Sequence, residues 1–322
     1  MKFSLYLLSR YRAQLMGIAI FLILVYHIPH NWFYFTFSLK LLRDYIYFGV
    51  DIFFFLSGFG VYFAYYNAQN LKNFYLQRIR RILPYCYPVM LVSAFVLYYL
   101  GRTNIVELIE MIFVVDFWIE GFLYDWFIPV ILLFYLLTPP LIKFLKKNGW
   151  QKLFVIYILC NILILFLYQD NNSLVLARFP LYCAGIVFAD MLANGREIKS
   201  RYLFMAVGVG LLLLGVNYWF GITGNIHWEY YSHYTAFFFL VPPICLFIAK
   251  IFSLTRYYDF PFLAFLGRYS LCIYIIHLRV LFAADVLITN RLLATVCVFV
   301  ISIALAYVWQ NLVSAILKRY WK

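Results

Sequence analysis

The stretch GVDIFFFLSGFGVYFAYY, residues 49–66, decides the fold because its length and composition match a membrane-spanning helix. Asp51 is its one charged side chain, and most of the other positions are apolar or aromatic. A helix needs about 20 predominantly apolar residues to cross the hydrocarbon core of a bilayer. The apolar run begins near residue 45, and we therefore predict a transmembrane helix over residues 45–66.

The rest of the chain has the same character. Hydrophobic residues make up 66% of the 322 residues and charged residues only 12%, whereas soluble domains carry about 25% charged residues. Such a chain cannot cover itself with polar surface, so lipid is the solvent that suits it. We predict an all-α, polytopic bundle of ten transmembrane helices that forms one domain over residues 1–322. The predicted spans are 14–33, 45–66, 82–100, 126–145, 152–169, 174–193, 202–220, 232–252, 264–283 and 293–316.

The distribution of charge predicts the orientation of the bundle. Basic residues concentrate on the cytoplasmic side of membrane proteins, and most of the 26 Lys and Arg residues fall in loops that share a side with the N-terminus. We therefore expect both termini in the cytoplasm. Topology thus accounts for the net charge of +13, and we expect no binding to nucleic acid. The acidic residues of one segment on the outer side are Glu107, Glu110, Asp116, Glu120 and Asp125.

The segment 105–119 is an apolar run that we do not expect to cross the membrane. It is short, and Glu107 and Glu110 interrupt it. A span here would reverse the side of every later loop, against the charge rule. We predict an interfacial or re-entrant segment on the outer face.

The N-terminus and the cysteines carry no sign of processing or metal binding. Residues 1–13 are basic and precede an apolar run without a small-residue cleavage site, which favours a retained signal anchor. The six cysteines lie in or beside apolar runs and show no CxxC spacing, so we interpret them as buried apolar thiols. We expect no metal.

Four polar side chains are predicted at membrane depth, where charge is costly and usually functional. His27 lies about 20 Å from the cytoplasmic face at about 1.5 Å per residue. Asp51 enters the second span from the other face, and we expect it at a similar depth. His277 and Arg178 reach the same level from two further helices. A carboxylate that orients an imidazole leaves the other ring nitrogen free as a base, but the same residues could merely bond helices together.

Residues 71–82, LKNFYLQRIRRI, carry a second polar cluster on the opposite face. Apolar side chains recur near helical spacing, which predicts an amphipathic helix on the cytoplasmic surface. It presents Arg78, Arg80 and Arg81, and three guanidinium groups suit a polyphosphate. From the residues alone, lipid head groups and an orientation signal are the favoured explanation of the same charges.

These motifs resemble those of the acyltransferase-3 family of bacterial membrane O-acyltransferases. GVDIFFFLSG is similar to the family's GVDxFFxLSG signature, and the RIRR stretch is similar to its basic entry to span three. Six segments in family order carry the resemblance from end to end of the chain. They are GIAIFLILVYH (17–27), GVDIFFFLSGFGVYFAYY (49–66), NFYLQRIRRILPYCYP (73–88), WFIPVILLFYLLTPPL (126–141), RFPLYCAGIVFA (178–189) and FLGRYSLCIYIIH (265–277).

The resemblance implies transfer of an acyl group, by default acetyl from acetyl-CoA, to a hydroxyl of a surface or exported polysaccharide. It implies a multi-pass protein of the bacterial plasma membrane whose acceptor is a free or lipid-linked glycan. His27 would act as base or carry the acyl group covalently, with Asp51 beside it. The residues expected to bind CoA phosphates are Arg78, Arg80, Arg81 and Arg12. The supporting or acceptor-binding residues are Ser57, Trp126, Arg178 and His277.

The sequence leaves one departure from the family pattern and two rival functions open. Many members of the family carry an arginine where this chain has Met16, and Arg12 lies one helical turn earlier. A transporter or flippase of a glycan precursor would use His27 and Asp51 as a proton relay, although no internal repeat supports it. A scaffold with a degenerate acyltransferase fold is the second rival.

Overall fold

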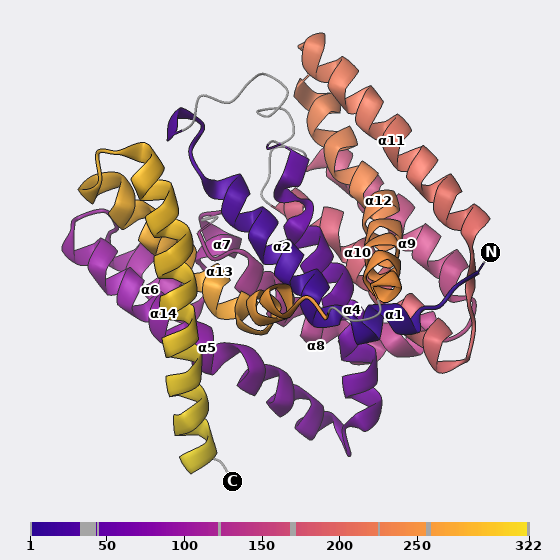
Figure 1. Ribbon diagram of the computed structural model, residues 1–322, viewed down its shortest axis with the longest axis horizontal. Coiled ribbons are helices and arrows are strands. Elements are labelled where there is room, and N and C mark those ends of the chain that lie inside the picture. The colour runs from indigo at the N-terminus through magenta and orange to yellow at the C-terminus, as the bar shows by residue number, and fades with distance from the viewer. Residues whose placement is uncertain are drawn as a thin grey trace. The chain divides into compact units, whose positions relative to one another are not determined.

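The computed structural model describes residues 2–32, 43, 45–121, 124–167, 172–224, 226–255 and 259–320. These residues form helices and one two-stranded ribbon (Figure 1). The first part holds β1 (Lys2–Phe3), α1 (Tyr6–Arg10), α2 (Arg12–His27), η1 (His30–Trp32), η2 (Ile46–Phe48), α4 (Gly49–Asn67), α5 (Leu71–Tyr99), α6 (Ile105–Phe113) and α7 (Asp116–Ile119). The second holds α8 (Phe127–Leu145), α9 (Gly149–Phe166), α10 (Asn172–Ala193), β2 (Ile198–Lys199), α11 (Ser200–Ile222), α12 (Ile226–Leu254), α13 (Pro261–Leu287) and α14 (Arg291–Tyr320).

The helices confirm the predicted fold class. Among the described residues, nine helices are long and apolar enough to cross a membrane. The first predicted span is the exception. Helix α2 has only 16 residues and ends at His27, so the predicted extension toward residue 33 is wrong for residues 28–32, and residue 33 itself lies outside the described part. His27 is therefore the last residue of its helix and does not lie inside a longer one. The cytoplasmic side of the termini stays a prediction.

Helix α5 corrects a second expectation. We predicted a surface helix over 71–82 followed by a separate span, whereas the structure has one helix of 29 residues with Pro84 and Pro88 inside it. Phe74 and Ile82 are buried, but Leu71 and Ile79 are exposed, so the proposed apolar face is only partly formed. The arginines of this region therefore lie on the first turns of a membrane-length helix.

Residues 105–119 follow the prediction that this segment does not span the membrane. They form the short helices α6 and α7. Asn104 caps α6, because its side chain accepts hydrogen bonds from the backbone of Val106 and Glu107 while Glu107 accepts one from the backbone of Asn104. Glu107 thus belongs to a capping box, which stabilises the start of a helix. Its position relative to a membrane interface stays a prediction.

The cysteines are free thiols, as expected. Five of the six are buried, and Cys297 is partly exposed. Their burial beside apolar side chains is the usual environment of a structural cysteine.

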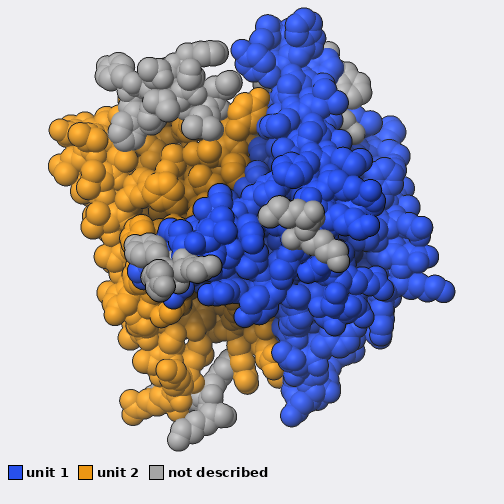
Figure 2. Space-filling model, turned by 45° about the vertical axis from the view of Figure 1, so that its right-hand side comes forward, with its two compact units in different colours: residues 1–15, 50–75, 133–261 blue, residues 16–49, 76–132, 262–322 orange. Residues whose placement is uncertain are grey.

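The chain divides into two compact units, coloured in Figure 2. Unit 1 contains residues 1–15, 50–75 and 133–261, and unit 2 contains residues 16–49, 76–132 and 262–322.

Helices α4 and α10 of unit 1 pack with their backbones in contact. A Cβ on Gly58 would lie 2.0 Å from the carbonyl oxygen of Tyr182, and one on Gly185 would lie 2.1 Å from that of Phe55. Small residues permit such close approach between membrane helices. Asp51 precedes Gly58 by seven residues, and Arg178 precedes Gly185 by seven. Two helical turns return to the same face, so this contact places both charged residues in the same interface.

Unit 1 also holds the ribbon that sequence patterns did not predict. β1 pairs antiparallel with β2, with Lys2 opposite Lys199 and Phe3 opposite Ile198. β2 leads directly into α11, which packs along α12 in Figure 1. The ribbon therefore fixes the chain where α11 begins.

Unit 2 is built around α2, α5, α13 and α14. Gly17 of α2 lies against α13, since a Cβ there would be 2.0 Å from the carbonyl oxygen of Leu263. Tyr85 of α5 bonds Ser314 of α14 at 3.1 Å, and Trp309 donates to the carbonyl of Tyr85 at 2.8 Å. An apolar cluster closes one end of the unit, formed by Ile28, Trp32, Ala284, Ala294 and Val298.

Gly58→Ala should lower the melting temperature of the purified protein, because the added methyl group forces α4 and α10 apart. Overpacking of this kind costs about 1–3 kcal/mol. Gly208→Ala on α11 is the matched control, since nothing lies within 4 Å of its Cβ position. Fluorescence-detected melting in detergent measures both. A Gly58→Ala variant that melts with the wild type would show that the close contact is not needed.

Candidate active site

Two histidines meet inside unit 2. Nε2 of His277, on α13, lies 3.3 Å from Nδ1 of His27, the last residue of α2. Their ring centroids are 4.8 Å apart, and the rings meet edge to face. His277 is fully buried, whereas His27 is partly exposed. The sequence predicted both residues at one level, and the structure brings them into contact.

The backbone carbonyls around this pair determine which ring nitrogens carry protons. Nδ1 of His277 lies 2.6 Å from the carbonyl oxygen of Tyr274, and Nδ1 of His27 lies 2.8 Å from that of Ile23. A carbonyl only accepts, so each Nδ1 donates. The N–H at His27 Nδ1 then donates to two acceptors, the carbonyl oxygen of Ile23 and Nε2 of His277. His27 is left with an unprotonated Nε2, the form that a general base requires.

Arg43 holds the end of α2 where His27 lies. Its guanidinium donates to the carbonyl oxygens of Tyr26 at 2.7 Å and Ile28 at 2.6 Å, and it also contacts Nε2 of His30. The last carbonyls of a helix have no partner within the helix, and a cation at this end is favourable. No sequence motif singled out Arg43.

Asp51 and Arg178 form an ion pair in unit 1. Nε of Arg178 lies 3.4 Å from Oδ1 of Asp51, and both side chains are almost fully buried. Oδ2 of Asp51 has no hydrogen-bond partner among the residues that the structure describes. A buried carboxylate oxygen without a bond is costly and marks the position as a candidate for binding a polar ligand. Ser57, on the same helix, is buried too.

The predicted contact between His27 and Asp51 joins residues of different units. It therefore stays a prediction, as does the catalytic role of either residue. Within their own units, His27 and Asp51 have different partners: His277 contacts His27, and Arg178 contacts Asp51.

The predicted phosphate-binding arginines have different surroundings. Arg80 lines a cleft of about 270 Å³ together with Tyr85, Ser314, Leu317 and Lys318. The cleft brings a cation from α5 together with one from α14, which no motif suggested. Arg81 is exposed and Arg78 is partly buried.

Arg12 has a structural contact in unit 1. It donates through Nε and Nη2 to the carbonyl oxygen of Leu56, at 3.3 and 3.2 Å. Gly60 leaves room for it, because a Cβ there would lie 2.8 Å from Nη2. The guanidinium thus packs against α4, and its expected role in place of an arginine at Met16 stays a prediction.

Residues 15–309 match the acyltransferase domain that defines the acyltransferase 3 family. The chain belongs to this family. No curated protein and no solved structure shows significant similarity to it. Family membership implies acyltransferase activity, and the long apolar helices make this acyltransferase a multi-pass membrane protein. Arg12 precedes the matched residues, whereas His27 and Asp51 lie inside them.

The acyltransferase has a further ionic cluster in unit 2 that sequence reasoning missed. Arg279 donates to both carboxylate oxygens of Asp125, at 2.7 and 2.5 Å, and to Oγ of Ser93 at 2.9 Å. Its guanidinium also lies 4.9 Å from the ring centre of Tyr124. This bidentate pair anchors the loop before α8 to α13 two residues after His277. Trp126, one residue beyond Asp125, contacts Phe117.

The acidic residues between positions 105 and 125 are close enough to influence one another. Burial, and then the charge of Asp125, raises the pKa of Asp116 to about 6. Burial and the charges of Glu120 and Glu107 raise the pKa of Glu110. Both carboxyl groups therefore bind protons more tightly in the folded protein than in the unfolded chain.

Asp116→Asn should change how stability depends on pH. The pKa of Asp116 is raised by folding, so its contribution is full below about pH 4 and is lost as the pH rises through about 6. The variant should therefore gain melting temperature relative to wild type between pH 5 and pH 7. Glu120→Gln is the control. Because Glu120 is exposed, this substitution should change the melting temperature less over the same pH range. A melting-temperature difference between Asp116→Asn and wild type that does not change with pH would contradict the raised pKa of Asp116.

Proposed function

We propose that this protein transfers an acetyl group from cytoplasmic acetyl-CoA to a hydroxyl of a cell-surface or exported polysaccharide. The observation that carries the proposal is the His277–His27 contact, which leaves Nε2 of His27 as a base. Membership of an acyltransferase family supports the reaction class. The acetyl group, the CoA donor, the glycan acceptor and a bacterial plasma membrane are parts of the proposal.

The proposed reaction needs one proton acceptor at the hydroxyl. Nε2 of His27 takes the proton as the hydroxyl oxygen attacks the thioester carbonyl. The carbon–sulfur bond then breaks, CoA leaves as a thiolate, and His27 returns the proton to the sulfur. In a two-step route the same nitrogen attacks the thioester carbonyl, and CoA leaves as a thiolate. The hydroxyl oxygen then attacks the acetyl group on His27, its proton passes to the thiolate, and Nε2 of His27 is released.

His277 has a defined part in this scheme. A proton gained by Nε2 leaves His27 positively charged, and its Nδ1–H then donates to His277 Nε2 and the Ile23 carbonyl more strongly. His277 stays neutral because its Nε2 accepts this hydrogen bond and therefore carries no proton, while its Nδ1 donates to the carbonyl of Tyr274. We therefore assign His277 as the positioning residue for the base. Asp51, with its free Oδ2 and its Arg178 partner, is the proposed carboxylate of the site.

The cleft beside Arg80 supports a cytoplasmic donor site. CoA carries phosphate groups, and the facing charges of Arg80 and Lys318 suit them. Exposed Arg81 adds a further cation nearby in the sequence. On the acceptor side, Trp126 and Tyr124 lie beside the acidic outer segment, and aromatic faces with carboxylates suit a sugar.

His27→Ala should lower acetyl transfer to surface glycans by about 10²–10⁴-fold or more. The amount of the variant protein in the membrane should not change. His277→Ala should lower kcat with little change in KM for acetyl-CoA, and should shift the pH profile of kcat. Mass spectrometry of the glycans and kinetics on purified protein measure these effects. Full activity of His27→Ala in membranes would show that His27 is not catalytic. An unshifted pH profile of kcat in His277→Ala would show that His277 only packs against its neighbours.

Arg80→Ala should raise KM for acetyl-CoA about tenfold or more, since a charge-assisted contact is lost. KM for the acceptor should not change. Lys72→Ala is the matched control, because Lys72 is exposed on the same helix and does not line the cleft. Equal effects of the two substitutions would place the donor elsewhere.

A further inference from the structure

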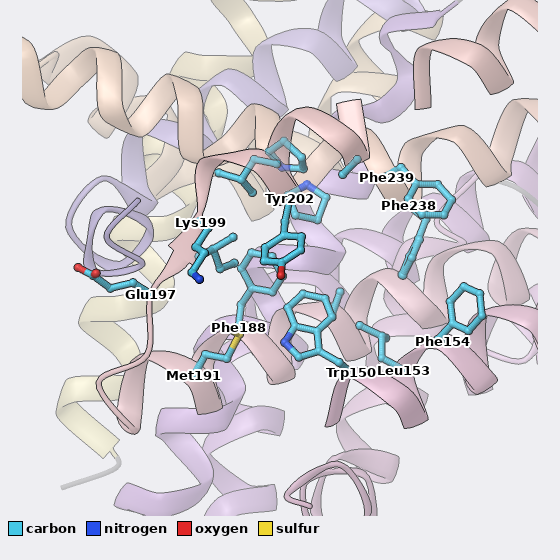
Figure 3. A pocket seen from close by; sticks show the side chains of 16 residues that line it. Trp150, Leu153, Phe154, Phe188, Met191, Glu197, Lys199, Tyr202, Phe238 and Phe239 are labelled. Atoms are coloured by element: carbon cyan, nitrogen blue, oxygen red, sulfur yellow. The ribbon is translucent and has the colours of Figure 1, made fainter. Parts of the chain in front are cut away.

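A large cavity in unit 1 is not used by the proposed reaction. It has a volume of about 590 Å³, within the range of about 300–1,000 Å³ typical of small-molecule sites. Helices α9, α10, α11 and α12 surround it together with β2 (Figure 3). The histidine pair and the Arg80 cleft belong to the other unit.

Most of the cavity wall is apolar. Aromatic rings dominate it, with Trp150, Phe154, Phe188, Phe238 and Phe239 among the lining side chains (Figure 3). Trp150 is 48% exposed and Phe154 55% exposed. All four helices contain membrane-length apolar stretches. In a bilayer these stretches would place the open side of the cavity against hydrocarbon.

One end of the cavity is cationic. Lys199 lines it and is exposed. Nη2 of Arg201 donates to the hydroxyl of Tyr202 at 2.8 Å, so that hydroxyl keeps its own proton to donate. Arg196 adds a third cation to this short segment. Glu197 is the one acidic residue of the segment, and its carboxylate extends away from the aromatic side chains in Figure 3.

The backbone adds to the positive potential at this end. Helix α11 begins at Ser200, and Lys199 occupies its cap position without a side-chain cap hydrogen bond. The first N–H groups of a helix attract anions. The β1–β2 pairing of Lys199 with Lys2 holds this helix start in place.

We propose that this cavity binds an anionic phospholipid. One acyl chain lies between the aromatic side chains. The phosphate group lies at the cationic end, where it accepts hydrogen bonds from Lys199 and from the hydroxyl of Tyr202.

Charge complementarity selects this occupant. The cations of residues 196–201 outnumber the single carboxylate, and this balance favours a headgroup with net negative charge. On the predicted topology the segment faces the cytoplasm, and anionic lipids give the cytoplasmic leaflet its negative surface potential. The apolar wall requires the phosphate to be attached to a hydrocarbon chain.

The test is lipid binding to the full-length protein after removal of bound lipid in detergent. Phosphatidylglycerol and phosphatidylcholine are titrated separately, and native mass spectrometry measures the affinity of the tightest site. Wild type should bind phosphatidylglycerol about tenfold more tightly than phosphatidylcholine, because the net charges of these lipids differ. Lys199→Glu should remove this preference. Lys146→Glu is the matched control, since exposed Lys146 does not line the cavity and should leave the preference unchanged.

A second readout locates the bound acyl chain. Phosphatidylglycerol with brominated chains should quench the fluorescence of Trp150, and Trp150→Phe should remove that part of the quenching. Ala206→Phe, which fills the cavity without changing charge, should weaken binding of phosphatidylglycerol at an unchanged melting temperature. Equal affinity for the two lipids, an unchanged preference in Lys199→Glu, or quenching independent of Trp150 would each overturn the proposal.

Discussion

The close approach of α4 and α10 at Gly58 and Gly185 is the constraint on which the interior of unit 1 depends. Two backbones that touch at one point fix which faces of the helices meet. Two turns before that point the faces carry Asp51 and Arg178, and one turn beyond it they carry Tyr62, which donates to Asp190 at 3.0 Å. The contacts occur in the same order along both helices, so the helices run parallel. A buried carboxylate far from water is tolerable only beside such a fixed partner.

In unit 2 a glycine again lets two helices approach closely, but the polar side chains that meet there are neutral histidines. Gly17 lets α2 approach α13, and further along the two helices His27 meets His277. The chain of donors from His27 to His277 and on to the Tyr274 carbonyl involves only neutral groups. It sets the tautomer of His27 without an ionised group hydrogen-bonded to the ring. In a membrane protein this arrangement avoids the desolvation cost of an ionised partner.

The basic residues divide by what their guanidinium groups contact. Arg12, Arg43 and Arg279 each donate to backbone carbonyls, and Arg279 also holds Asp125. These contacts hold helix ends and loops in place. Arg80 instead lines a cleft opposite Lys318. A count of positive charges reports topology, whereas the surroundings of each cation show whether it holds a helix end or lines a cleft.

The sequence by itself determined the membrane class, the approximate helix boundaries and the family, because length, hydropathy and the GVDIFFFLSG motif are local properties. It also selected His27, Asp51, Arg178 and His277, since ionisable groups are rare in apolar helices. It could not pair them. The partner of each histidine and each carboxylate depends on which helix faces meet, and glycines seven or more residues away decide that. For the same reason the Arg279–Asp125 pair, the early end of α2 and the aromatic cavity beside Lys199 emerged only from the tertiary structure.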